Sequence, residues 1–291
     1  VYLREISTLA IPLFWQPVAG NHPRGSLSQY GLDPAAFVPV PGLIERLAAA
    51  GVPTYVFLRH DFLNSGFSLI LHRGLTEAGA RPHLNSSDIW PRLRELLAET
   101  AGQRCYISVY WDQVDTLSHA YGSGNAYLHH EVRRQLADLR AVLADDSVRD
   151  GRTLVLFLAD HGHANTPHVL NVRAEPRAAP IYDALHGFMS GEGRLPYLHL
   201  RAGFRQAVID CLEAAFADCL AWIDPAAALE AGLFGPGPSY AEVPHRLGDL
   251  ILVPRLGWKL DDGSGPPSQM VSSHGGLSDW EMLVPLLWKR L

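Results

Sequence analysis

The chain has 291 residues, 47% of them hydrophobic, and a formal net charge of −6 at pH 7. This length and apolar content suffice for one large globular domain, or for one domain with a sizeable insertion. The acidic net charge and the lack of a basic stripe exclude an extended nucleic-acid-binding surface, and no apolar run in the sequence is long enough for a transmembrane helix.

The three cysteines, Cys105, Cys211 and Cys219, are odd in number and form no C-x-x-C pair. Such a set is typical of free thiols in a reducing compartment. The sequence also lacks a charged segment followed by an apolar one, the pattern of a secretory leader. We therefore expect a cytoplasmic protein, while a start at Val1 instead of Met leaves room for a removed leader.

The first half of the chain alternates apolar strands with helical patterns. TYVFLR (54–59) predicts a strand, and residues 88–101 predict a helix. RCYISVYW (104–111) predicts a buried strand, residues 125–146 predict an amphipathic helix, and TLVLFLA (153–159) is the clearest buried strand. Continuous apolar strands separated by helices are typical of an α/β fold, in which helices cover both faces of a mostly parallel central sheet.

The middle of the chain has a mixed pattern that breaks this alternation. We expect an inserted subdomain, or cap, over 171–254 and an α/β core formed by 1–170 and 255–291. The elements predicted within the insertion are strands at 196–202, 220–224 and 249–254 and helices near 203–218 and 225–232.

The last stretch, GLSDWEMLVPLLW, combines a helical turn with an apolar strand. Ser278, with Glu281 three residues later, predicts a capping box at the start of the turn. Pro285 has no N–H to donate to a neighbouring strand, so the strand beside it is expected at the edge of a sheet.

Acidic and histidine side chains follow two of these strands and recur near the C-terminus. Asp115 and His119 are four positions apart, so on a helix they project from one side. Asp160 and His161 directly follow the strand 153–159, and His274 precedes two glycines that let backbone approach closely. Ligands of open parallel sheets bind at the carboxyl ends of the strands, so we expect these side chains to lie together.

Carboxylate oxygens and imidazole nitrogens are suitable ligands for zinc or manganese. Five such residues from three segments suit a two-metal site, whose ions lie roughly 3.5–4 Å apart. A site of this kind stabilises the attacking and leaving oxygens of a reaction at phosphorus. Each motif alone also fits an ordinary turn or helix surface, so the prediction depends on their joint occurrence.

The motifs DTLSHAYG, ADHG and SHGG resemble those of the alkaline phosphatase superfamily, nearest to its type I phosphodiesterase/nucleotide pyrophosphatase branch. The segments 190–203 and 276–287 are similar to linking segments of that branch, so the resemblance covers about residues 105–291. It implies metal-dependent hydrolysis of a small phosphorylated substrate, such as a nucleotide, with two divalent ions. Zinc is the favoured ion, and manganese is the second choice.

The resemblance also implies roles for particular residues. In these enzymes one metal is held by an Asp, a His four residues later and a late His, which fall on Asp115, His119 and His274. The second metal is held by the Asp-His pair, which falls on Asp160 and His161. An early Asp and a Ser or Thr nucleophile at a helix N-terminus complete the second site in these enzymes.

Neither of these last two residues has a convincing counterpart in the sequence. The opening VYLREI is similar to a segment that follows the nucleophile helix in relatives. We therefore expect an N-terminal piece to be missing from the chain, with the catalytic nucleophile upstream. The alternative is that this half of the site has been lost, which would leave no covalent catalysis.

Two further residues are candidates for substrate binding or for supporting the ligands. His163 contacts phosphate or a ligand in one interpretation and is an ordinary loop histidine in the other. Arg194 could bind an anionic substrate through its guanidinium, or pair with a carboxylate where the subdomain joins the core.

Two other functions stay open from the sequence. One is a degenerate relative that binds metal or a phosphorylated ligand without turnover, and the other is a phosphomutase or sulfate-ester hydrolase with the same metal chemistry. Upstream sequence with a strand ending in Asp and a Thr/Ser-rich helix start would favour the enzyme. The substrate and the oligomeric state are not specified.

Overall fold

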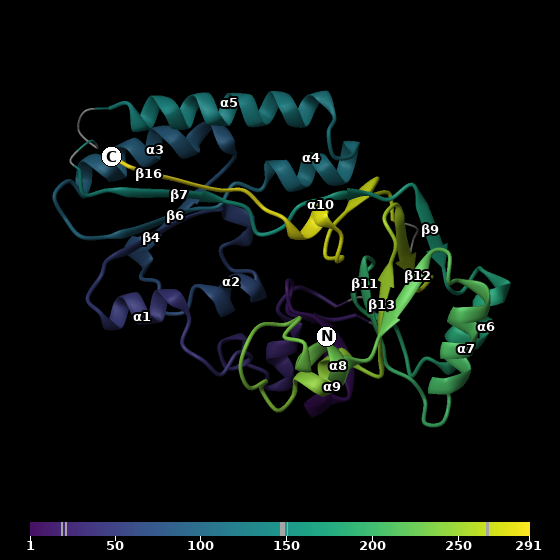
Figure 1. Ribbon diagram of the computed structural model, residues 1–291. Helices are drawn as coiled ribbons and strands as arrows, with labels where there is room; N and C mark the ends of the chain where they lie inside the picture. The colour runs from purple at the N-terminus through teal and green to yellow at the C-terminus, as the bar shows by residue number, and fades with distance from the viewer. Residues whose placement is uncertain (19, 21, 146–148, 150, 266–267) are drawn as a thin grey trace. The chain divides into compact units, whose positions relative to one another are not determined.

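The computed structural model describes residues 1–18, 20, 22–145, 149, 151–265 and 268–291. The chain forms two compact units, which are described separately (Figure 1). The first unit comprises residues 1–10, 117–125 and 159–285, and the second comprises 11–116, 126–158 and 286–291.

The second unit contains a parallel sheet in the order β5-β4-β6. Its central strand coincides with the strand predicted at 54–59, and a shorter strand and helix lie within the predictions at 104–111 and 125–146. Residue 146 of that predicted helix lies outside the described residues. The elements are β4 (Thr54–Arg59), β5 (Ala80–His83), β6 (Tyr106–Val109), α1 (Leu43–Ala49), α2 (Gly66–Leu71), α3 (Ser86–Glu99) and α5 (Ala126–Leu143).

Helices cover both faces of β4 because its apolar residues alternate between the faces. Phe57 packs with Leu93 of α3 and Val142 of α5. Val56 of β4 points to the opposite face and packs with Ile44 of α1. Figure 1 shows the same arrangement, with α3 and α5 along one side of the strands and α1 along the other. This part of the unit has the predicted α/β layering.

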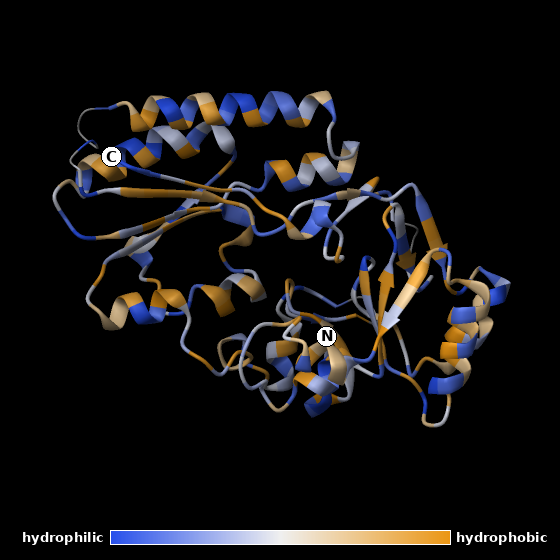
Figure 2. Cartoon of the chain, viewed as in Figure 1, coloured by the Kyte–Doolittle hydropathy of each residue, from blue (hydrophilic) through white to orange (hydrophobic). Residues whose placement is uncertain are grey.

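The strand β7 (Leu154–Leu158) departs from the prediction of a buried strand. It pairs only with β16 (Leu286–Arg290), in antiparallel register, among the described strands. Its leucines at 154, 156 and 158 are 56–60% exposed, and Figure 2 shows β7 as a continuous hydrophobic stretch. An apolar run is buried only where another layer covers it, and among the described residues no such layer covers these leucines. The edge position predicted for β16 is confirmed.

The first unit contains an antiparallel sheet in the order β10-β11-β13-β12. Leu250 and Leu252 of β13 belong to a core with α6 and α7, whereas Ile251 points the other way and packs with Ala228 of α8. The strands and helices predicted within 196–254 are confirmed: β11 (Leu195–Leu198), α7 (Arg205–Ala215), β12 (Leu220–Ile223), α8 (Pro225–Glu230) and β13 (Leu250–Pro254).

The remaining strands are β1 (Tyr2–Leu3), β2 (Thr8–Ile11), β3 (Gln16–Pro17), β8 (Ala164–Asn165), β9 (His168–Asn171), β10 (Ser190–Glu192), β14 (Trp258–Asp261) and β15 (Ser272–Ser273). The remaining α-helices are α4 (Gln113–Tyr121), α6 (Ala179–Ala184), α9 (Val243–Leu247) and α10 (Asp279–Met282). Besides the pairs of β4, only β9 and β14 are parallel among the described pairs. The mixed α/β class is confirmed, but a mostly parallel central sheet is not. Among the described helices, none is both long and apolar enough to cross a lipid bilayer.

Candidate metal centre

The helix α4 presents the first two predicted ligands. Asp115 and His119 lie one turn apart, as their spacing predicts. The helix is continuous, beginning in the second unit and ending in the first. Its last turn is anchored in the first unit because the His119 carbonyl accepts the backbone N–H of Val271 at 2.9 Å.

A short ladder between β8 and β15 brings the other histidines together. Ser272 lies opposite Asn165, and Ser273 lies opposite Ala164, in antiparallel register. Continuing this register by one residue places His163 opposite His274. The loop after β7 and the SHGG motif, more than a hundred residues apart in sequence, therefore meet here.

Four histidine rings form one group at this ladder. The His161 and His274 rings stack with centroids 3.8 Å apart, and the His119 ring lies 5.1 Å from the His274 ring. The His163 ring lies 4.9 Å from His119, 5.2 Å from His274 and 5.5 Å from His161. All four residues are half-buried, so a small ion can reach them from solvent.

Backbone carbonyls orient two of these rings. Nδ1 of His119 lies 2.8 Å from the carbonyl oxygen of Ser272, and Nδ1 of His161 lies 3.0 Å from that of Gly162. A carbonyl oxygen only accepts hydrogen bonds, so each Nδ1 carries the proton and donates it. Nε2 is then the atom of each ring that would coordinate a metal ion.

Two sets of three residues have ligand atoms that all lie within 4.8 Å of one another. Asp115, His119 and His163 form one set, and Asp115, His161 and His274 form the other. Four of the five predicted ligands, together with His163, are thus brought together. The mixture of imidazole nitrogen and carboxylate oxygen fits a zinc or manganese ion.

Asp160, the fifth predicted ligand, belongs to neither set. It lies beside its neighbour, with Oδ2 3.7 Å from Nε2 of His161, and its side chain is 62% exposed. Two ligands of one tetrahedral zinc ion lie roughly 3.4 Å apart, given metal–ligand bonds of about 2.0–2.2 Å. The spacing of this pair is therefore compatible with a shared ion.

The structure shows why position 162 of the ADHG motif is a glycine. Its N–H donates to the carbonyl of Glu281 at 2.8 Å, and an added Cβ would collide with the carbonyl oxygen of Trp280. The loop between the two histidines 161 and 163 can approach α10 this closely only without a side chain.

Arg194 lies in a buried ion pair. Its Nε and Nη2 donate to Oε1 and Oε2 of Glu281 at 2.9 and 2.7 Å, and both side chains are 1% exposed. Its Nη1 donates to the carbonyls of Pro254 at 3.1 Å and Arg255 at 2.8 Å. The carboxylate partner considered from the sequence is therefore Glu281, and every guanidinium nitrogen bonds within the protein.

The capping box predicted at Ser278 is wrong. Ser278 is the N-cap residue of α10, but its side chain makes no capping hydrogen bond. Its hydroxyl instead donates to Oε2 of Glu281 at 2.6 Å, and the N–H of Gly276 donates to Oε1 at 2.9 Å. Burial alone would raise the pKa of Glu281, but hydrogen bonds from Arg194 and Ser278 outweigh it and lower that pKa. The Glu281 carboxylate binds the Arg194 guanidinium and therefore does not cap the helix.

Ser272 is the residue at this centre that sequence reasoning missed. It is fully buried, its carbonyl contacts His119, and its hydroxyl lies 3.1 Å from Nδ1 of His163. Its position two residues before His274 in SSHGG was the available signal. A serine in a loop has too many ordinary roles for that signal to be specific.

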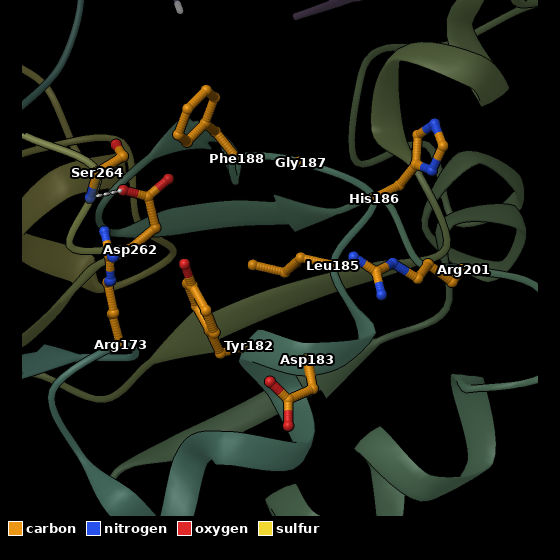
Figure 3. A pocket seen from close by; sticks show the side chains of 10 residues that line it. All are labelled: Arg173, Tyr182, Asp183, Leu185, His186, Gly187, Phe188, Arg201, Asp262 and Ser264. Atoms are coloured by element: carbon orange, nitrogen blue, oxygen red, sulfur yellow. Dashed lines mark hydrogen bonds between the residues drawn. The ribbon is translucent and has the colours of Figure 1, made fainter.

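A separate open pocket of about 410 Å³ lies in the first unit (Figure 3). Its charged lining includes Arg173, Arg201 and Asp262, and the Asp262 carboxylate accepts the N–H of Ser264 at 2.9 Å. None of the predicted site residues is among its lining residues. The histidine group and this pocket are thus different features of the unit.

The fold is similar to that of solved hydrolase structures. Human ectonucleotide pyrophosphatase/phosphodiesterase 5 (ENPP5) superposes with a TM-score of 0.61 at 14% identity, covering 88% of this chain and 65% of that one. Murine ENPP5 gives 0.60 at 14% identity, with 84% and 62% covered. Phosphonoacetate hydrolase from Sinorhizobium meliloti 1021 gives 0.58 at 18% identity, with 88% and 69% covered. The chain thus spans less than two thirds of the ENPP5 chains and shares the fold of these structures.

The sequence supports a closer assignment. The profile of the type I phosphodiesterase/nucleotide pyrophosphatase family matches residues 89–277. The chain belongs to this family. A comparison with curated proteins finds no match.

Proposed function

We propose that this protein hydrolyses phosphate esters with the help of divalent metal ions, as a phosphodiesterase or nucleotide pyrophosphatase. The observation that carries the proposal is the meeting of four histidine rings from three separate segments of the first unit. All these residues lie within 89–277, the part of the chain that matches the family profile.

The donor set supports a role in metal binding. We assign Asp115, His119 and His274 to one ion and Asp160 and His161 to a second, following the family pattern. Zinc is preferred because it takes mixed nitrogen and oxygen ligands, with manganese as the second choice. When bound, such ions supply positive charge that activates a nucleophile and stabilises the phosphoryl oxygens.

The protein's own groups prepare the site for this chemistry. The carbonyls of Ser272 and Gly162 accept hydrogen bonds from Nδ1 of His119 and His161, so Nε2 is the atom of each ring that would coordinate an ion. Hydrogen-bonded rings lose less conformational freedom when they bind an ion, so the site is partly preorganised.

The proposed substrate is a small molecule with a phosphorus oxyanion, such as a nucleotide. A murine ENPP5 structure holds AMP, at a TM-score of 0.56 and 13% identity to this chain. Structures of phosphonoacetate hydrolase hold phosphonoacetate or phosphonoformate. These ligands share the phosphorus oxyanion, so we propose that class of substrate.

Hydrolysis of bis(4-nitrophenyl) phosphate and of a 4-nitrophenyl nucleotide ester tests the proposal. The assay uses the full-length protein, which has to supply the Ser or Thr nucleophile that the family pattern requires; without metal it should be inactive, and added zinc or manganese should produce 4-nitrophenolate. His274→Ala and Asp160→Ala should reduce the rate at least a hundredfold, because each removes a proposed ligand. His168→Ala is the matched control, since its ring packs on Trp258 at 4.8 Å instead. Full activity in either ligand variant would refute the assignment.

A further inference from the structure

His163 lies in the histidine group, but the five ligands assigned above do not include it. Its ring is 4.9 Å from the His119 ring and 5.2 Å from the His274 ring. Its ligand atom lies within 4.8 Å of those of Asp115 and His119. The structure thus places this residue as close to the centre as the assigned ligands.

The hydrogen bonds of Ser272 determine which nitrogen of His163 carries a proton. The Ser272 hydroxyl donates its single hydrogen to the carbonyl oxygen of Ala164 at 3.1 Å. The same oxygen lies 3.1 Å from Nδ1 of His163, so it accepts there, and Nδ1 donates. Nε2 is therefore the ring nitrogen through which His163 would coordinate a metal ion.

Ser272 therefore orients two rings at once. Its carbonyl accepts from Nδ1 of His119, and its hydroxyl accepts from Nδ1 of His163. Ser272 is fully buried in the β8–β15 ladder, which fixes both acceptors in place. Metal-binding histidines commonly have this second hydrogen bond to a protein oxygen, because it sets the tautomer and raises ligand basicity.

We propose that His163 is an additional metal ligand, coordinating through Nε2 the ion held by Asp115 and His119, and that Ser272 is the positioning residue for both rings. This inference rests on the proposed metal centre. The His163 ring lies 4.9 Å from the His119 ring and both rings contact Ser272 through Nδ1, so Nε2 is the atom of each ring that would coordinate the ion.

Cobalt(II) titration of the whole chain, followed by visible absorption, tests the proposal. His163→Asn is the informative variant, because the asparagine amide can still donate to Ser272 from the position of Nδ1 but has no Nε2. We expect its cobalt affinity to fall about a hundredfold or more and its absorption spectrum to change. Ser272→Ala should weaken binding about tenfold while keeping the spectrum, since Nε2 of each ring remains. His168→Asn is the matched control and should bind as the unchanged protein does.

The outcomes separate this inference from the proposed function. If the unchanged chain binds no cobalt, the metal centre itself is refuted, and this inference with it. If His119→Asn loses cobalt but His163→Asn binds it normally with an unaltered spectrum, only this inference is overturned.

A measurement without substitution covers the case in which His163→Asn does not fold. Long-range ¹H–¹⁵N spectra of the zinc-loaded protein report each imidazole whose Nε2 binds metal. The proposal predicts four such rings, namely His119, His161, His163 and His274. Ligation of the other three rings, with the His163 ring unchanged by zinc, would overturn it.

Discussion

Arg194 and Glu281 show how a single residue pair connects distant segments of the first unit. The guanidinium bridges the carbonyls that follow β13 to the carboxylate of α10. Glu281 also accepts the N–H of Gly276, two residues after His274. The buried pair thus holds the loop that carries a proposed metal ligand.

Glu281→Gln should destabilise the protein by about 3 kcal/mol, because it leaves the buried Arg194 charge without its counter-charge. Thermal or urea unfolding at pH 7 measures this loss. Glu175→Gln, which removes a partner of the exposed Arg177, should leave the stability nearly unchanged, because solvent screens an exposed ion pair. Equal losses in both variants would contradict the role given to the buried pair.

The same pair predicts a pH dependence. The pKa of Glu281 is lower in the folded protein than its usual value, so the stability it contributes is present above the unfolded pKa. That contribution is lost as the pH falls through the folded pKa. The stability gap between the unchanged protein and Glu281→Gln should therefore narrow under acid conditions.

At the scale of elements, local periodicity predicted structure well where other elements cover both faces of the predicted strand. The strand 54–59 was predicted to the residue because its apolar side chains are covered on both faces. The strand 153–159 was located, but its burial was wrong, since β7 has β16 as its one described partner. Composition identifies an apolar strand but cannot show what covers it.

The ADHG loop supports a test at the element scale. Gly162→Ala should push the loop away from α10, because the added Cβ meets the Trp280 carbonyl. We expect lower stability and weaker metal binding, since His161 and His163 flank the displaced residue. Gly187→Ala is the control, because nothing lies within 4 Å of a Cβ there and its backbone is ordinary. If Gly162→Ala leaves the metal affinity unchanged, the loop does not hold His161 and His163 in a fixed geometry.

At the scale of the whole molecule, the sequence predicted the family and the grouping of four ligands. Spacing on α4 and at the end of β7 was enough to predict Asp115, His119 and His161 as candidate ligands. The role of Ser272 was not predictable, because its bonds to His163 and His119 cross 109 and 153 residues of sequence. Nor could the sequence distinguish a substrate contact for Arg194 from its bonds inside the protein.

The central claim is that Asp115 and the histidines form a divalent metal centre, and metal content tests it most directly. The protein is equilibrated with zinc or, separately, with manganese, then dialysed and analysed for bound metal, beside His119→Asn and the control His168→Asn. We predict that zinc is retained by the unchanged protein and the control and is reduced in His119→Asn. Absence of retained zinc or manganese, or equal retention in His119→Asn, would contradict the account.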